Sequence, residues 1–204
     1  MRVAVSGAAG RLGRALIEAL GDAPFSGPLG PIAWSRPDFD LDAPGRYVGL
    51  LDRDRPEVVV HAAAWTDVDG CAREPELALG RNGIATGRLA EACAERGIDL
   101  IVVSTNEVFD GRRSDGQGYG PGDAPNPINA YGASKLAGEV AALAAFDGAP
   151  AAGRPALGIV RTAWLYGPPG NDFPTKILAA AERASATSAA YVGVPHSSST
   201  TRSG

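Results

Sequence analysis

Two side chains that could act on a proton stand four residues apart in the stretch "YGASK". The phenol of Tyr131 and the amine of Lys135 share one face if this segment is helical, because residues i and i+4 are neighbours on a helix. A nearby ammonium lowers the pKa of a phenol from its usual value of about 10. Such a phenol can give or take a proton at a carbonyl oxygen. The pair therefore indicates acid–base chemistry, although the same spacing is common on ordinary exposed helices.

A third group suited to this chemistry closes the apolar run "DLIVVST". Ser104 and Thr105 are its last two residues. A hydroxyl at a strand end can hydrogen-bond a substrate carbonyl and hold it for reaction, although serine and threonine also occur there simply as caps. We therefore take Thr105, Tyr131 and Lys135 as the candidate catalytic residues.

A glycine-rich segment, "GAAGRLG", follows the first apolar run and precedes an amphipathic stretch. In this context Gly7 permits a tight turn, Gly10 lets a pyrophosphate approach the backbone, and Gly13 allows close packing of helix on strand. The helix that begins here would point its N-terminus at the phosphates. The alternative is a plain strand-to-helix turn in a glycine-rich chain. The context favours a dinucleotide-binding turn that includes Arg11 and Leu12.

The chain around these residues alternates short apolar runs with helical patterns. The run "EVVVHAAA" is typical of a strand buried on both faces, and Gly97 is suited to end a helix. Strands are expected over residues 2–7, 30–35, 57–64, 99–105 and 156–167, and helices over 11–20, 47–54, 76–97 and 129–145. Strands that alternate with helices predict an α/β fold with a doubly wound parallel sheet.

The composition narrows the class of protein. The chain has 204 residues and a formal net charge of −4, without a basic stripe, which argues against nucleic acid as a partner. No window approaches the roughly 20 apolar residues of a membrane span, and the N-terminus lacks a signal-peptide pattern. The cysteines and histidines do not fall in the spacings of metal sites. We expect a cytoplasmic protein without a metal, in which Cys71 and Cys93 are buried and reduced.

The end of the chain has a different character. Beyond about residue 183 the sequence is rich in serine and threonine and lacks periodicity, as disordered segments do. We predict a dinucleotide-binding domain over residues 1–170. Residues 171–204 would then be the remnant of a second lobe and a disordered tail.

Four further blocks carry a resemblance to a known family. "HAAAWTDVDGCA", "STNEVFDG", "NAYGASKLAGE" and "RTAWLYG" look like the successive blocks of the dTDP-4-dehydrorhamnose reductases, the RmlD-type branch of the extended short-chain dehydrogenases/reductases. With the glycine segment, the resemblance covers residues 1 to about 175. It implies a Rossmann-like NAD(P)-binding fold. It also implies NAD(P)H-dependent reduction of the 4-keto group of a dTDP-4-dehydro-6-deoxyhexose.

The resemblance implies a role for each residue of the site. Thr105 orients the keto oxygen, Tyr131 supplies the proton, and Lys135 tunes Tyr131 and holds the nicotinamide ribose. Trp164 lies against the sugar or the nicotinamide, unless it packs in the core at a strand end. Along the cofactor we expect Gly7, Gly10, Arg11, Leu12, Gly13, Arg36, Asp40, Leu41, Ala62, Ala63, Thr66, Ser104 and Lys135.

The chain departs from this family in two ways. Where the family block usually reads "STDYVFDG", this chain has Asn106 and Glu107, at positions that the resemblance places against the substrate. Glu107 adds a carboxylate there, which points to a different sugar or a related deoxysugar reductase. Family members are also considerably longer. We hypothesise a truncation or frameshift after about Arg183, which would leave the C-terminal substrate lobe incomplete.

The choice of cofactor can be argued from one arginine. The strand expected over residues 30–35 is followed by Arg36, and not by the acid that would bind the ribose hydroxyls of NAD. An arginine can pair with the 2′-phosphate of NADP, although Arg36 could equally be an ordinary surface residue. NADPH is favoured, and NADH stays open.

Two other functions stay open from the sequence. Some relatives keep the Rossmann domain as non-catalytic regulatory subunits. The intact Thr105, Tyr131 and Lys135 argue against this reading, and the altered Asn106 and Glu107, with the short C-terminus, argue for it. A nucleotide-sugar epimerase or dehydratase is the second alternative, although dehydratases usually carry an acidic pair of which Glu107 is only one member. The expected partner is a dTDP-sugar, and a homodimer is left open.

Overall fold

The computed structural model describes residues 1–24, 30–149, 154–167 and 175–183. The chain divides into two compact units, Met1–Ala163 and Trp164–Gly204. The second unit contains a helix over residues 175–183. The predicted domain boundary after residue 170 and the predicted lobe remnant stay predictions, and the predicted tail beyond residue 183 lies outside the described residues.

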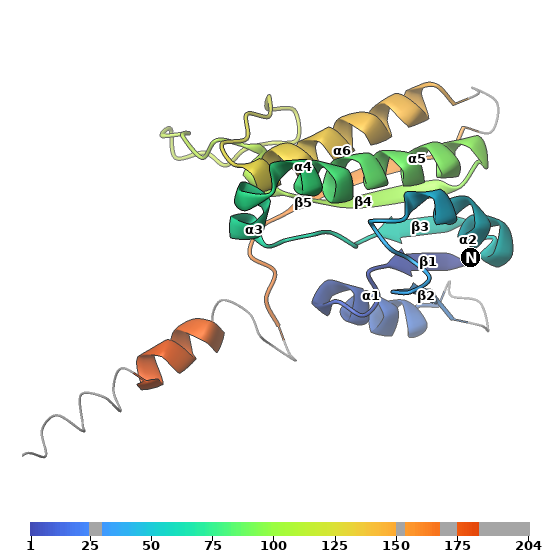
Figure 1. Ribbon diagram of the computed structural model, residues 1–204, viewed down its shortest axis with the longest axis horizontal. Helices are drawn as coiled ribbons and strands as arrows, with labels where there is room; N and C mark the ends of the chain where they lie inside the picture. The colour runs from blue at the N-terminus through green and yellow to red at the C-terminus, as the bar shows by residue number, and fades with distance from the viewer. Residues whose placement is uncertain (25–29, 150–153, 168–174, 184–204) are drawn as a thin grey trace, which may run out of the picture. The chain divides into compact units, whose positions relative to one another are not determined.

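The first unit is built on a five-stranded sheet in which all strands are parallel (Figure 1). The strands are β1 (Val3–Ser6), β2 (Ile32–Trp34), β3 (Val58–His61), β4 (Asp99–Thr105) and β5 (Leu157–Thr162), in the spatial order β2-β1-β3-β4-β5. The strand order reverses beside β1. In open parallel sheets, ligands bind outside the carboxyl ends of the strands at such a reversal.

Helical segments connect the strands. They are α1 (Arg11–Gly21), η1 (Pro44–Arg46), α2 (Tyr47–Asp54), α3 (Val68–Arg73), α4 (Pro75–Ala78), η2 (Leu79–Ile84), α5 (Ala85–Glu95), η3 (Asn106–Val108) and α6 (Ala130–Asp147). Two cores lie on opposite faces of the sheet: α2, α5 and α6 contribute to one, and α1 contributes to the other. The predicted doubly wound α/β fold is therefore confirmed.

Alternate residues of the strands supply the two cores, because successive side chains of a strand point to opposite faces. Val59, Leu100 and Val102 pack with residues of α2, α5 and α6. Val3, Val5 and Val60 pack against α1. Burial on both faces explains why these strands are continuous apolar runs instead of alternating patterns.

The prediction of one continuous helix over residues 76–97 is wrong, because the helix is interrupted near its middle. The structure breaks it into α4, a wide π-helical turn at η2, and α5. At this turn Asn82 is buried, and its side chain bonds both the backbone N–H and the carbonyl of Trp65. The backbone carbonyl of Asn82 accepts the hydroxyl of Thr86 at 2.7 Å. The predicted end at Gly97 is confirmed by its positive φ of 66°.

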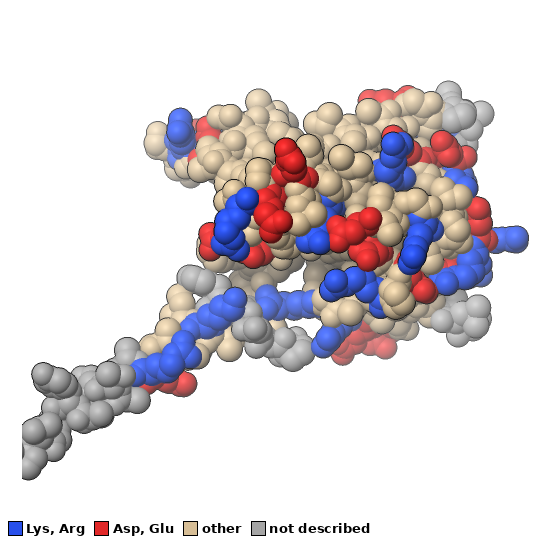
Figure 2. All heavy atoms as spheres, viewed as in Figure 1, with Lys and Arg blue, Asp and Glu red and all other residues tan. Residues whose placement is uncertain are grey.

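Several features of the surface and interior bear on the class of protein. Cys71 and Cys93 are buried and free, as predicted. No helix in the described ranges is long and apolar enough to cross a membrane, and no three histidine, cysteine or acidic side chains among the described residues form a metal-binding group. Basic and acidic side chains are interspersed over the visible face of the first unit (Figure 2).

Candidate functional site

The glycine turn after β1 has the geometry that its sequence predicts. Gly7 has a φ of 70°, which favours glycine, and its carbonyl accepts the Gly10 N–H at 2.8 Å. A Cβ added to Gly13 would stand 2.1 Å from that same carbonyl oxygen. The start of α1 therefore packs directly on the turn, with its free N–H groups at the carboxyl end of β1.

A groove of about 340 Å³ opens beside this turn. Of the residues predicted to bind a cofactor, those that line it are Gly7, Gly10, Arg36, Asp40, Leu41, Ala62 and Ala63. Arg11, Leu12, Gly13, Thr66, Ser104 and Lys135 are not among the lining residues. Asp42, which the resemblance places with Asp40 beside the adenine, lines it as well. Sequence reasoning missed other members of the wall: Ala9, Ser35, Phe39, Ala64, Trp65 and Arg81.

Arg81 is the most informative of the missed residues. It reaches the groove from η2, where its Nε and Nη2 both lie 2.7 Å from the carboxylate of Asp42. Its guanidinium also lies 5.1 Å from the Trp65 ring centroid. The hydrogen bond from Arg81 is the main cause that holds the pKa of Asp42 below its usual value. The two residues are far apart in sequence, so no local pattern could have paired them.

The three predicted catalytic residues come together at the carboxyl end of β4. Thr105 is the last residue of β4, and its Oγ1 accepts the backbone N–H of Glu107 at 3.2 Å. Tyr131 lies in the first turn of α6, near enough to Thr105 for that side chain to lower the pKa of the phenol. Tyr131, Thr105 and Lys135 are all buried. A hydroxyl and a phenol this near to each other can together hold a carbonyl oxygen between them.

The first turn of α6 is fixed against η3 by close backbone contact. Asn129 caps the helix by accepting the Gly132 N–H at 2.7 Å, and its side-chain amide donates to Glu107 at 2.6 Å. A Cβ added to Gly132 would stand 2.1 Å from the Glu107 carbonyl oxygen. Only a glycine lets the helix approach so closely, and this approach brings Tyr131 to Thr105.

Lys135 is held by a hydrogen bond to β4, and its predicted contact with the nicotinamide ribose stays a prediction. Its Nζ donates to the carbonyl oxygen of Val103 at 2.8 Å. Burial lowers its pKa to about 8, and the charge of Glu139 partly opposes that effect. The ammonium is therefore poised to change its protonation state only a little above neutral pH.

The pKa of Tyr131 differs in direction from the sequence expectation. Burial raises it, the hydrogen bond from Thr105 lowers it, and the charges of Glu107 and Cys71 raise it further. Burial outweighs the rest, because moving a phenolate out of water disfavours the charged form. A phenol with a raised pKa stays protonated near neutral pH, which suits a proton donor.

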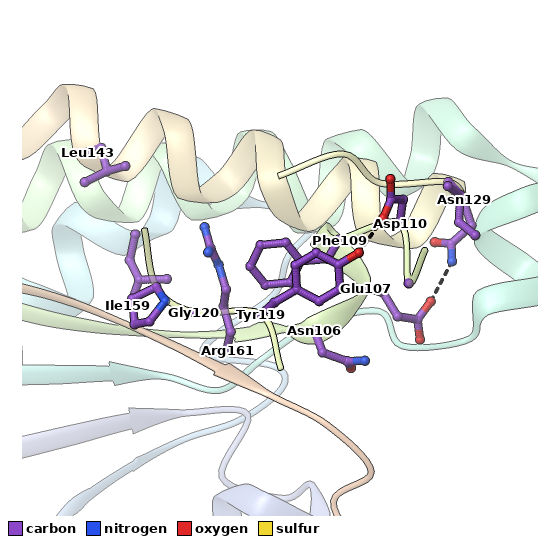
Figure 3. Close-up of a pocket in the computed structure, with 13 residues that line it drawn as sticks. Asn106, Glu107, Phe109, Asp110, Tyr119, Gly120, Asn129, Leu143, Ile159 and Arg161 are labelled. Carbon is purple, nitrogen blue, oxygen red and sulfur yellow. Dashed lines mark hydrogen bonds between the residues drawn. The ribbon is translucent and has the colours of Figure 1, made fainter. Parts of the chain in front are cut away.

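A larger cavity of about 780 Å³ lies beyond Glu107. Its polar lining includes Asn106, Glu107 and Asn129, so two of the residues predicted to face a substrate open onto it (Figure 3). Phe109 and Tyr119 stack in its wall with ring centroids 4.4 Å apart. Arg161 lies 5.0 Å from the Phe109 ring centroid, so the wall carries one arginine beside two carboxylate-bearing residues, Glu107 and Asp110.

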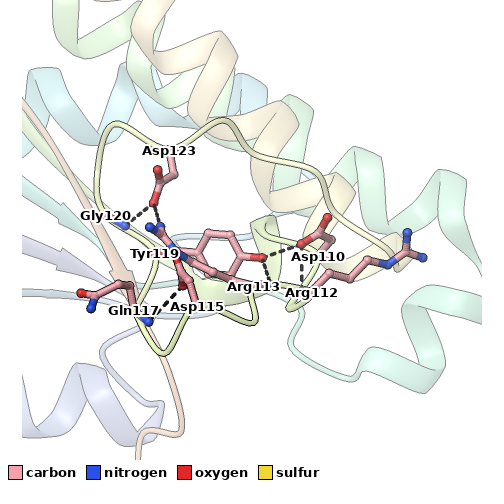
Figure 4. Close-up of polar contacts among 8 residues, drawn as sticks. All are labelled: Asp110, Arg112, Arg113, Asp115, Gln117, Tyr119, Gly120 and Asp123. Carbon is pink, nitrogen blue, oxygen red and sulfur yellow. Dashed lines mark hydrogen bonds and ion pairs between the residues drawn. The ribbon is translucent and has the colours of Figure 1, made fainter.

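Hydrogen bonds and ion pairs among its own residues hold the turn-rich segment after η3 together (Figure 4). Asp110 accepts the Tyr119 hydroxyl at 2.5 Å and the Arg112 N–H at 3.0 Å, and these bonds hold its pKa at about 2. Arg113 pairs with Asp115 at 2.9 Å and Asp123 at 2.8 Å. These contacts stabilise the loop that forms one wall of the larger cavity.

Buried hydrogen bonds through His61 link the end of β1 to α5. Nδ1 of His61 lies 2.8 Å from the hydroxyl of Ser6, and Nε2 lies 3.1 Å from that of Thr86. The imidazole is fully buried, and burial together with the charge of Lys135 lowers its pKa to about 3. His61 is therefore a neutral hydrogen-bonding centre, and its place at the end of a buried strand was its only signal in the sequence.

Ser104 and Trp164 complete the set of residues predicted for the site. The Ser104 hydroxyl is buried and donates to Glu139. Trp164 is the first residue of the second unit, and its role as a substrate contact stays a prediction.

The parallel sheet, the glycine turn and the Thr105–Tyr131–Lys135 cluster define a Rossmann-type nucleotide-binding domain with a tyrosine–lysine site. Residues 1–194 match the RmlD substrate binding domain family, and the chain belongs to that family. It is 39% identical over 174 residues to a dTDP-4-keto-6-deoxy-D-glucose reductase of Streptomyces niveus, covering 85% of this chain and 56% of that protein. It is 38% identical over 198 residues to the dTDP-4-dehydrorhamnose reductase of Mycolicibacterium smegmatis, covering 95% of this chain and 56% of the relative.

The fold is likewise similar to solved structures. The dTDP-4-dehydrorhamnose reductase of Bacillus anthracis in complex with NADP superposes with a TM-score of 0.76 and 32% identity, covering 89% of this chain and 60% of that one. The chain thus spans little more than half the length of the curated relatives it matches.

Proposed function

We propose that this chain acts as an NAD(P)H-dependent reductase of the 4-keto group of a dTDP-4-dehydro-6-deoxyhexose, with NADPH as the favoured cofactor. The observation that carries the proposal is the convergence of Thr105, Tyr131 and Lys135 at the carboxyl end of β4. The reductases named among its relatives, and the NADP that the Bacillus anthracis relative binds, support the choice of reaction and cofactor.

The groove fits a dinucleotide on physical grounds. The turn at Gly7 and the start of α1 offer backbone N–H groups and a helix N-terminus to a pyrophosphate. A Cβ at Gly7 would stand 2.8 Å from the Cα of Ala63, so this wall tolerates no side chain. Arg36 lines the same groove near the end of β2 and would hold a 2′-phosphate.

The side chains of the site then have defined tasks. A reduced nicotinamide supplies the hydride when it is bound. The Thr105 hydroxyl hydrogen-bonds the keto oxygen, and Tyr131 gives that oxygen its proton, which its raised pKa keeps available. Lys135 holds the nicotinamide ribose. Glu107 and Asn129, joined at 2.6 Å, offer an acceptor and a donor to hydroxyls of the sugar.

The test is the stoichiometry of cofactor use. The purified chain is mixed with NADPH and a dTDP-4-keto-6-deoxyhexose, and NADPH oxidised is compared with keto sugar consumed. A reductase consumes the two in equal amounts. Sugar conversion without net NADPH oxidation would indicate an epimerase or dehydratase, and tight NADPH binding without any conversion would indicate a regulatory subunit; either result would overturn the proposal.

A further inference from the structure

Three elements of the site meet at a single buried carboxylate. Glu139 on α6 is 1% exposed. It accepts the hydroxyl of Ser104 on β4 and the guanidinium of Arg161 on β5, with Nη2 of Arg161 2.6 Å from Oε2 and Nε 3.1 Å from Oε1. Ser104 and Arg161 are register partners in the β4–β5 pair. The carboxylate therefore joins α6 to two adjacent strands at one level.

This junction, formed by Glu139, Ser104 and Arg161, lies next to the catalytic residues in the chain and on α6. Ser104 precedes Thr105 on β4. Lys135 stands one helical turn before Glu139, so the two side chains share a face of α6. The Thr162 hydroxyl donates to the Ser104 carbonyl at 3.1 Å, which adds a second link between the ends of β4 and β5. Figure 3 shows Arg161 extending from β5 toward α6.

The junction also supplies a negative charge where one is needed. A buried ammonium is disfavoured unless an opposite charge lies near it. Glu139 is that charge for Lys135. Other titratable or charged groups lie around Lys135, Tyr131 and Glu139. They are Tyr131 itself on α6, His61 on β3, Arg161 on β5, Glu107 on η3 and Cys71 on α3. The side chains from η2 and α5, Asn82 and Thr86, are neutral.

We propose that Glu139 is a positioning residue of the reductase site. With Arg161 and Ser104 it fixes α6 on the ends of β4 and β5, and its buried carboxylate keeps Lys135 protonated for its task. This inference rests on the proposed function, because Glu139 affects the reaction only through the catalytic residues that it helps to position.

The chain allows a clean test, because Lys135 and Lys176 are its only lysines. The full-length chain is labelled with ¹³C-lysine, and the Cε signals are titrated by NMR. In Glu139→Gln we expect the pKa of Lys135 to fall by about one unit or more, since loss of an opposite charge at this range has that effect. The exposed Lys176 serves as the internal control and stays unchanged.

The sign of the shift separates this role from a purely structural one. A variant that merely loosened the fold would admit water to Lys135, and its pKa would rise toward the ordinary value of about 10.4. An unchanged or raised pKa of Lys135 in folded Glu139→Gln would overturn the proposal. Arg161→Met is the matched control. It removes the positive charge of the Arg161–Glu139 pair and keeps the carboxylate, so the pKa of Lys135 should stay the same or rise.

Glu139→Gln leaves Arg161 without its carboxylate, which can prevent folding. The double variant Glu139→Gln, Arg161→Met removes both charges and should still lower the pKa of Lys135; an unchanged value there counts against the proposal. The NMR readout needs no turnover, so its result stands apart from the test of the reductase activity. If the wild type reduces the keto sugar, the pH dependence of kcat/KM should move in Glu139→Gln by the same amount as the pKa of Lys135.

Discussion

The Nζ of Lys135 on α6 lies 2.8 Å from the carbonyl oxygen of Val103 on β4, two residues before Thr105. This bond ties the helix that carries the acid–base residues to the strand that carries the hydroxyl. The close packing of Gly132 on the Glu107 carbonyl ties the N-terminus of α6 to η3, which directly follows that strand. The relative position of Thr105 and Tyr131 is thus fixed by two contacts, one from the Lys135 side chain to the backbone of β4 and one between the backbones of α6 and η3.

Substitution of Gly132 tests this positioning. In Gly132→Ala the new Cβ would stand 2.1 Å from the Glu107 carbonyl oxygen, so α6 must move away from η3. We expect a loss of about 1–3 kcal/mol in unfolding free energy, the usual cost of overpacking. We also expect a fall in turnover on the order of 100-fold, as misplacement of catalytic groups by about 1 Å produces. Urea unfolding and steady-state kinetics measure the two effects.

Gly49→Ala is the matched control for this substitution. Gly49 is also helical, within α2, and a Cβ there meets no atom within 4 Å. Its replacement should raise stability by up to about 1 kcal/mol through helix propensity and leave turnover as it was. Equal behaviour of the two alanine variants would refute the proposed packing of Gly132.

Arg36 should set the preference for NADPH. If its guanidinium pairs with the 2′-phosphate, Arg36→Gln loses a charge-assisted hydrogen bond worth about 1.5–3 kcal/mol. The dissociation constant of NADPH should then rise roughly 10- to 100-fold, while that of NADH changes little. Fluorescence titration with both cofactors measures this, and Arg88→Gln on the exposed side of α5 is the control. An equal loss for both cofactors would show that Arg36 does not read the 2′-phosphate.

The buried imidazole of His61 makes stability depend on pH. Its pKa is lowered to about 3 in the folded protein, against about 6.5 when unfolded. The unfolded chain therefore binds the proton first, and stability is lost as pH falls below about 6.5. At pH 5 this residue alone should remove roughly 2 kcal/mol relative to pH 8.

His61→Gln checks this prediction. Urea unfolding at pH 5 and pH 8 gives the change in unfolding free energy with pH for the wild type and for the variant. The variant should be less stable at pH 8, since Ser6 and Thr86 lose a buried partner, but its stability should fall less on acidification. Parallel pH dependence in the two proteins would show that His61 is not a buried neutral group.

The fold and the centre of the site could be predicted because their signals are local. Strands buried on both faces appear as continuous apolar runs, and the turn at Gly7 needs a residue without a Cβ wherever it occurs. The spacing of Tyr131 and Lys135 is a property of any helix. The resemblance of the surrounding blocks then pointed to the family, which the match over residues 1–194 confirms.

The missed parts depend on contacts between distant segments. Arg81 meets Asp42 only because the fold brings η2 to the edge of the groove, and Glu139 meets Arg161 only because β5 lies beside β4. The break in the helix at η2 follows from the hydrogen bonds of Asn82 to Trp65, which no helical pattern contains. The direction of the Tyr131 pKa depends on how deeply the phenol is buried, and spacing alone carries no information about burial.

The most direct test of the account is turnover by Tyr131→Phe beside the wild type, with NADPH binding measured on the same preparations. The substitution removes only the hydroxyl that gives the proton, so the dissociation constant of NADPH should stay within about twofold of the wild-type value. Reduction of a dTDP-4-keto-6-deoxyhexose should fall by at least about 100-fold, the lower range for loss of a general acid. Undiminished reduction by Tyr131→Phe would contradict the account, because the proton would then come from elsewhere.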